Sequence, residues 1–483
     1  MKIIPHIRKT TNNFGLGAFI TLVLSILIFV LTILRLVQPT SMLTLVTVFC
    51  FLLLFFAVGI DTVFIFAILL LFVPINFMFA KVEGWDLNDI ILPILLIYFL
   101  FRKIWRHKTL TRIPPFSLPI LLFFLIAFMH ILTLRELPEI AGDIVNLTVP
   151  KGGYRIFYDL LLSGIIYFIT PFILIREEQI RGPIFLLLGM FLLVIVISML
   201  RIGLGWETMA TSESYSTRLH YINTGQETVT RVGILGVAGY WLYLIGLIFF
   251  QQHSIKLFLS LVCISIASIL LSGGRAPFIS LVLSTSFFLY FRGRKVFAII
   301  PNILLLLTLL FFGLNNQYLV SLPPILQRPL GLFSPDNPSY SDGNTRKEMW
   351  TIALKKISSD PLWGKQYIEN SNRFDEGALA NVQRGGAHNV YLSTAASFGM
   401  PALFLWLMAA ISYYKKIVHL YRISSSFQLL NKFCLLLAIF LGTSFITYLF
   451  EGGAGGGVKY FLTLGLIDSA YNIYGQKELT KTK

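Results

Sequence analysis

Residues 296–313 read VFAIIPNILLLLTLLFFG, an apolar run that is long enough to cross a bilayer and carries no charged side chain. Similar runs recur at Phe14–Leu34, Met42–Val58, Ile255–Leu271 and Phe433–Phe450. Hydrophobic residues make up 56% of the 483-residue chain and its mean hydropathy is +0.77, which excludes an ordinary soluble domain. The sequence therefore predicts an all-α protein, a polytopic transmembrane helix bundle of about 12 to 14 spans.

The net charge of +16 comes from basic clusters that lie between the apolar runs. They fall at alternate loops, including Arg102–Arg112, Arg292–Lys295 and Lys415–Arg422. The positive-inside rule then places these loops and both termini in the cytoplasm. A large loop, residues 315–387, is expected to face outward. Because the positive charge follows the topology, nucleic acid is not an expected partner.

The external loop contains one amphipathic segment. Thr345–Glu348 has the spacing of a capping box, and Pro361 is expected to stop the helix that follows. One face of this helix carries apolar residues, namely Trp350, Ala353, Leu354 and Ile357. We expect the helix to lie in the headgroup plane and to roof a cavity over the bundle. Arg346 either points into that cavity or is simply solvated.

Two arginines stand at the starts of expected spans. Ser272–Pro277 is a tight glycine turn that places Arg275 in the first turn of the next helix, where backbone N–H groups favour anions. The alternative is an interfacial arginine that reaches the headgroups. Arg231 precedes the run Val232–Gly236 in the same way and, taken alone, is a helix-end anchor. Together the two arginines suit a diphosphate clamp, because guanidinium groups bind phosphate oxygens bidentately.

The stretch Gly385–Leu392 places His388 and Asn389 where a polar loop meets a new apolar helix. A neutral imidazole there suits a general base for a sugar hydroxyl. The alternative is that Asn389 is only a helix N-cap and His388 a surface neighbour. Tyr391 is expected to pack or to hydrogen-bond, and Glu451, in a second external glycine hinge, could orient His388 or an acceptor hydroxyl.

No acidic pair with metal-ligand spacing accompanies these residues, so neither a metal nor another cofactor is expected. The organisation that follows has three parts. Residues 1–230 form N-terminal spans, residues 231–411 form a core that includes the external loop, and residues 412–483 form C-terminal spans and a tail.

These residues, in this order, resemble the superfamily of O-antigen ligases and O-antigen polymerases, which act in the bacterial envelope. The resembling pieces are Arg231–Gly236, the turn ending in Arg275, Arg346 and Trp350 with Pro361–Gly364, His388–Leu392, and Phe398–Pro401. They cover some third of the chain, and their order and spacing are more specific than any single piece.

The resemblance implies a glycosyltransferase of the bacterial inner membrane that uses an undecaprenyl-diphosphate-linked glycan as donor, without metal or nucleotide. By that likeness, Arg231 and Arg275 hold the diphosphate, and His388 activates a saccharide acceptor such as the lipid A-core on the external, periplasmic face. Membrane lipid, a chain-length regulator and a flippase are the other partners that the resemblance implies.

Other functions remain open from the sequence. A polymerase that joins lipid-linked repeat units is as well supported as a ligase. A flippase or transporter would place charged residues deep in the spans, lining a path, whereas here they cluster at the outer helix ends. A non-catalytic envelope scaffold is the third alternative.

Overall fold

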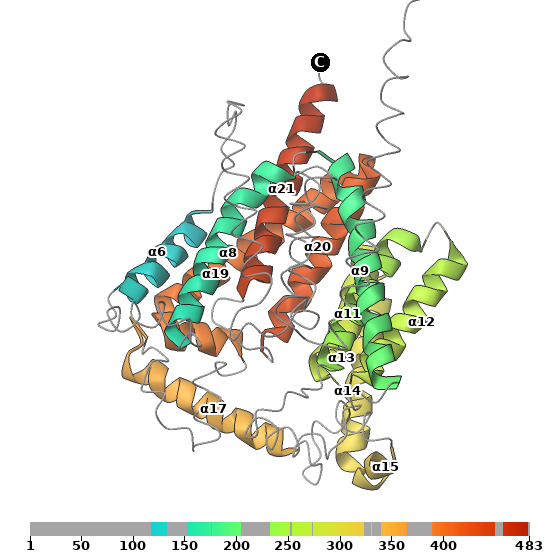
Figure 1. Cartoon of the computed structure of the whole chain (residues 1–483), viewed down its shortest axis with the longest axis horizontal. Coiled ribbons are helices and arrows are strands. Elements are labelled where there is room, and N and C mark those ends of the chain that lie inside the picture. Colours follow the sequence, from blue (N-terminus) through green and yellow to red (C-terminus); the bar gives the residue numbers. More distant parts are fainter. Residues whose placement is uncertain are drawn as a thin grey trace, which may run out of the picture. The chain divides into compact units, whose positions relative to one another are not determined.

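The computed structural model describes residues 117–132, 152–174, 176–203, 232–251, 254–272, 274–322, 330, 340–364, 389–449 and 457–481. Within these ranges every regular element is a helix, and Figure 1 shows their course along the chain. The prediction of an all-α protein is confirmed for this part of the chain.

The α-helices before residue 300 have these bounds: α6, Leu118–Leu132; α8, Gly152–Ile173; α9, Glu178–Gly203; α11, Val232–Ile245; α12, Ile255–Leu271; α13, Arg275–Phe291; and α14, Lys295–Leu314. Those that follow are α15, Asn316–Ser321; α17, Tyr340–Ser359; α19, Val390–Ile423; α20, Gln428–Thr447; and α21, Gly457–Lys481. A π-helical turn, Gly246–Phe250, extends α11, and a 3-10 turn, Ser424–Ser426, extends α19.

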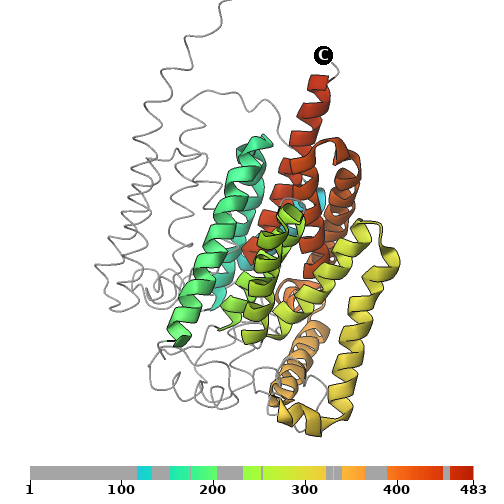
Figure 2. The ribbon, with the colours of Figure 1, turned by 90° about the vertical axis from the view of Figure 1, so that its right-hand side faces the viewer.

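Three of the described helices are long and apolar enough to span a membrane: α14, α19 with its 3-10 extension, and α20. They differ in how much of the apolar stretch other helices cover, from 11% buried in α14 to 72% in α20. Figure 2 shows α13 and α14 as a helical hairpin, and most of the apolar stretch of α14 is not buried by the rest of the structure. Membrane-spanning length and apolar composition therefore support a membrane protein.

Close helix contacts are made at glycines. A Cβ atom on Gly236 of α11 would lie 2.4 Å from Ser272 Oγ, and one on Gly239 would lie 2.8 Å from the Ser265 carbonyl oxygen of α12. At Gly465, α21 approaches α8 in the same way, since a Cβ atom would lie 2.9 Å from Thr170 Cβ. Small residues let helix backbones approach closely where no hydrophobic effect drives them together.

The helix α19 is sharply bent. Gly399 has φ 85° and ψ 168°, a conformation that is open essentially to glycine alone, and Pro401 follows it. We call residues 390–398 the short arm of α19 and residues 400–423 its long arm. Tyr391 and Trp406 would lie about 22 Å apart on a straight helix. Their ring centroids are 5.7 Å apart, so the short arm folds back along the long arm.

Candidate functional site

Asn389, the residue after position 388, is the N-cap of the short arm. Asn389 has an extended backbone (φ −153°, ψ 111°), and its side chain accepts a hydrogen bond from the Leu392 N–H at 3.0 Å. The residue is only 5% exposed. The helix starts where the sequence predicted, and Asn389 is its N-cap, the role that the sequence offered as the alternative to a part in catalysis. The cap is buried inside the helix bundle.

Two further hydrogen bonds join the start of the short arm to the end of α20. The Val390 N–H donates to the Tyr448 carbonyl at 2.9 Å, and the Tyr391 hydroxyl donates to the Phe445 carbonyl. The last carbonyls of a helix have no partner within it, so α20 offers its free acceptors here. The three residues that follow position 388 are thereby fixed, and the hydrogen-bonding role predicted for Tyr391 has a defined partner.

An aromatic cluster supports the same place. Trp406 of the long arm is 1% exposed and stacks on Tyr460 of α21, with 4.6 Å between ring centroids. Tyr391 meets the Trp406 ring edge-on, and Tyr448 lies 5.9 Å away on another side. The rings of Trp406, Tyr448 and Tyr460 are buried, and that of Tyr391 is half-buried, so together they pack behind the short arm.

The amphipathic helix α17 packs against the short arm. Ala353 of α17 and Ala396 of the short arm are both fully buried, and the side chains packed around them are Trp350, Ile352, Ile357 and Leu392. Leu354 was expected on the same face, but it is 55% exposed. The helix starts at Tyr340, so Thr345 lies inside it, and the capping-box spacing did not mark the true start. It ends at Ser359, as Pro361 predicted.

The segment that follows α17 is in direct backbone contact with the bend of α19. The Met400 N–H, freed by the bend, donates to the Pro361 carbonyl at 2.8 Å. A Cβ atom on Gly364 would lie 2.7 Å from the Gly399 nitrogen, and one on Gly399 would lie 2.1 Å from the Leu362 carbonyl oxygen. Two stretches that the sequence analysis named separately, 361–364 and 398–401, thus form one junction.

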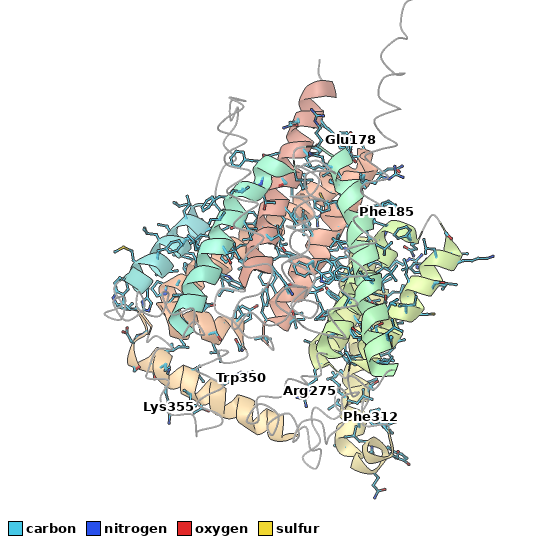
Figure 3. All side chains as sticks on the ribbon, in the orientation of Figure 1. Glu178, Phe185, Arg275, Phe312, Trp350 and Lys355 are labelled. Atoms are coloured by element: carbon cyan, nitrogen blue, oxygen red, sulfur yellow. The ribbon has the colours of Figure 1, made fainter. Side chains whose placement is uncertain are left out.

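Arg275 is the first residue of α13 and is half-buried, as the glycine turn predicted. The Ser272 hydroxyl closes the turn by accepting from the Gly274 N–H at 3.1 Å and donating to the Ile269 carbonyl at 2.7 Å. Gly236, near the start of α11, lies against Ser272. The first turns of α11 and α13 are therefore neighbours. Figure 3 labels Arg275, and also Trp350 on α17.

Several predicted site residues lie outside the described part of the chain. They are His388, Arg231 and Glu451, together with the side chain of Arg346, whose backbone belongs to α17. The structure brings Asn389 and Tyr391 together at the end of α20, and it places Arg275 on α13, which also packs against α20. The roles of His388 and of both arginines stay predictions.

The sequence analysis missed a charged cluster. Asp468 of α21 is 2% exposed, and its carboxylate accepts hydrogen bonds from Lys416 Nζ at 2.5 Å and from the Tyr413 hydroxyl at 2.6 Å. The Tyr167 hydroxyl lies 2.7 Å from that of Tyr413 and accepts from the Ser117 N–H at 3.2 Å. We call Asp468, Lys416, Tyr413 and Tyr167 the buried ion-pair network. It ties α8, α19 and α21 together.

The expectation that charged side chains stay at the helix ends is wrong for Asp468. An ionised carboxylate is costly in an apolar interior unless it is paired, and here a cation and a hydroxyl offset that cost. A signal was present in the sequence, because Asp468 interrupts the apolar run Tyr460–Ala470. Its partners Tyr413 and Lys416 are more than fifty residues away in the sequence, so no local sequence pattern predicts them.

A comparison with protein families gives the identity of the central part. Residues 259–407 match the model of the O-antigen ligase family, Wzy_C. The central part of the chain is therefore similar to the O-antigen ligase superfamily. The family indicates a membrane glycosyltransferase of the ligase or polymerase type, and the apolar helices agree with a membrane location. None of the curated proteins matches the chain significantly.

The matched segment runs from within α12 to the long arm of α19. It includes the turn before Arg275, all of α17, the Gly364–Gly399 junction and the short arm. The start of α11 and the hinge at Glu451 lie beyond its two ends. Of the elements that meet at the short arm, α17 and the long arm up to residue 407 lie within the match, whereas α20 and α21 lie beyond it.

Proposed function

We propose that this protein is a metal-independent glycosyltransferase that moves a glycan from undecaprenyl diphosphate to a saccharide acceptor, the lipopolysaccharide core. The observation that carries the proposal is the O-antigen ligase match over residues 259–407, which contains Arg275, Asn389 and Tyr391. The proposed topology has about 12 to 14 spans, cytoplasmic termini, and residues 315–387 on the external face of the bacterial inner membrane.

The proposed chemistry is a displacement at the anomeric carbon of the donor. His388 takes the proton of the acceptor hydroxyl as that oxygen bonds to the anomeric carbon. The bond from this carbon to the diphosphate oxygen breaks, and the leaving lipid diphosphate gains a negative charge. Arg231 and Arg275 would stabilise this charge, because preorganised donors act where charge develops. Asn389 and Tyr391 support this role by fixing the backbone next to His388.

Extraction of surface glycans from a strain that lacks the gene distinguishes the ligase from the polymerase. A ligase predicts long chains that remain on the lipid carrier while the core stays bare. A polymerase, the alternative within this superfamily, predicts single repeats that are still attached to the core. Unchanged glycans in the deletion strain would reject both enzymes.

The His388→Ala variant tests the general base. We expect transfer to fall by about 10²-fold or more, with normal amounts of protein in the membrane. His419→Ala is a matched control, because His419 is an exposed histidine on the long arm of the same helix. Retained transfer in His388→Ala would remove the base assignment.

The Arg275→Lys variant tests the diphosphate clamp. It keeps the positive charge and loses the planar fork, so donor use should fall although insertion is unchanged. Arg294→Lys provides the control, since Arg294 is exposed beyond the opposite end of α13. Equal donor use in the two variants would contradict a bidentate clamp at Arg275.

A flippase or transporter for lipid-linked sugars is the second candidate, and the buried ion-pair network favours it. Charged groups inside a membrane bundle commonly mark a transport path. This function predicts that the deletion strain accumulates the lipid-linked glycan on the cytoplasmic face. Accumulation on the external face would instead agree with the transferase.

A further inference from the structure

Tyr391 links the start of the short arm to α20 through its side chain. Its hydroxyl donates to the Phe445 carbonyl in the last turn of α20. In a helix that continued, that carbonyl would accept from the Leu449 N–H. Leu449 donates instead to Ile446 at 3.1 Å, and Tyr448 donates to Ser444 at 2.9 Å. The Tyr391 hydroxyl therefore bonds to a carbonyl that has lost its partner within α20 because the helix ends there.

The ring of Tyr391 is held as firmly as its hydroxyl. It meets Trp406 at an interplanar angle of 85°, and Trp406 is fixed between the long arm and Tyr460 of α21. The adjacent Val390 N–H donates to Tyr448, so two bonds in succession join this strip of backbone to α20. A shift of the short arm along α20 would break both of them.

We propose that Tyr391 is a positioning residue for His388: by tying the start of the short arm to the end of α20, it fixes the backbone that directly follows position 388. The inference rests on the proposed function, in which His388 takes the acceptor proton. Only three positions separate the two residues, and Asn389 and Val390 between them are fixed as well. A displacement of about 1 Å in a catalytic group can cost 10²-fold in rate.

The test compares Tyr391→Phe with Tyr460→Phe. Each variant keeps its ring and loses one hydroxyl that donates to a backbone carbonyl. The bond of Tyr391 is part-buried, and that of Tyr460, to the Trp406 carbonyl at 3.3 Å, is buried. Tyr460 donates to the long arm rather than to α20, so it is the matched control. Transfer is measured in proteoliposomes with a lipid-linked glycan donor, and kcat and KM are determined separately for each variant.

We expect Tyr391→Phe to lower kcat by about 10-fold to 100-fold with KM nearly unchanged, because substrate binding is kept while the base is misplaced. Tyr460→Phe should keep the kcat of the wild-type protein. Equal kcat values for the two variants, whether high or low, would overturn the positioning role, since loosening of the aromatic cluster would then explain any loss.

A double variant keeps the test decisive if Tyr391→Phe also destabilises the protein. In a His388→Ala background, adding Tyr391→Phe should leave the residual rate unchanged, because a residue that acts through His388 has nothing left to position. A further fall in that rate would overturn the inference. An active His388→Ala protein would instead overturn the proposed function, so the two failures are distinguishable.

Discussion

The two arms of α19 are held in place by different means. The short arm is fixed by backbone carbonyls of α20, by a buried N-cap and by small residues against α17. The long arm is fixed by an acid, a lysine and two tyrosines around Asp468. Neutral hydrogen bonds leave no charge stranded when they open, whereas a buried ion pair does. We therefore expect the long arm to set stability and the short arm to set activity.

The junction between the arms should give the largest effect. Gly399→Ala forces a Cβ atom to 2.1 Å from the Leu362 carbonyl oxygen and puts alanine at φ 85°. A cost of roughly 3 kcal/mol or more should follow, with loss of folded protein in detergent thermal melts. Gly189→Ala on α9 is the control, since nothing lies within 4 Å of its Cβ position. Equal melting of both variants would show that the arms are not joined in this way.

Lys416→Met should be the most damaging single change in the long arm. It strands the Asp468 carboxylate in the interior, at a cost of about 3 to 5 kcal/mol. The double variant Lys416→Met with Asp468→Leu removes both charges and should recover most of the melting temperature. A double variant that is no more stable than the single one would mean that the pair is not the source of the stability.

Tyr413→Phe should cost less, roughly 2 kcal/mol, because Asp468 keeps Lys416 but loses a hydroxyl donor. The Tyr167 hydroxyl also loses one of its partners. Tyr243→Phe is a control, since this variant breaks one hydroxyl pair, with Thr285, that involves no charge. Melting curves in one detergent rank the two variants, and a larger loss in Tyr243→Phe would contradict the proposed charge effect.

Asn389→Ala should lower the free energy of unfolding least among these variants, by about 1 kcal/mol, because it removes one N-cap. Its effect on transfer should be larger than that of Tyr413→Phe, which sharpens the contrast between the arms. Asn389→Ser restores a capping oxygen and should regain both properties in part. Transfer rates and melting temperatures measured on the same preparations check the order, and a reversed order would refute the division of roles.

Local features of the fold were predictable from the sequence, and contacts between distant segments were not. The Ser272–Pro277 turn placed Arg275 correctly, because glycine allows the tight turns that other residues avoid. Pro361 marked the end of α17, because proline restricts its own backbone and lacks an N–H donor. The Thr345 capping box failed since such a pattern also fits inside a helix. The partners of Asp468 and of Tyr391 lie 52 to 55 residues away in sequence, and only packing decides them.

The candidate site was predictable to the same degree. Asn389 as an N-cap follows from residue type, and Tyr391 was already expected to hydrogen-bond. No periodicity indicates that the short arm folds back on Trp406, because this depends on a single glycine torsion. The positions of His388, Arg231 and Glu451 lie outside the described residues, so their convergence with Arg275 stays a prediction.

The mutual approach of Gly364 and Gly399 limits how the chain can be altered by engineering. Each glycine has positive φ, and a methyl group on either would collide with main-chain atoms of the other segment. A second substitution in the facing segment cannot remove such a collision, because the atoms that collide belong to the peptide groups that every residue carries. A randomised library over 361–364 and 398–401 should therefore return active clones in which both positions are still glycine.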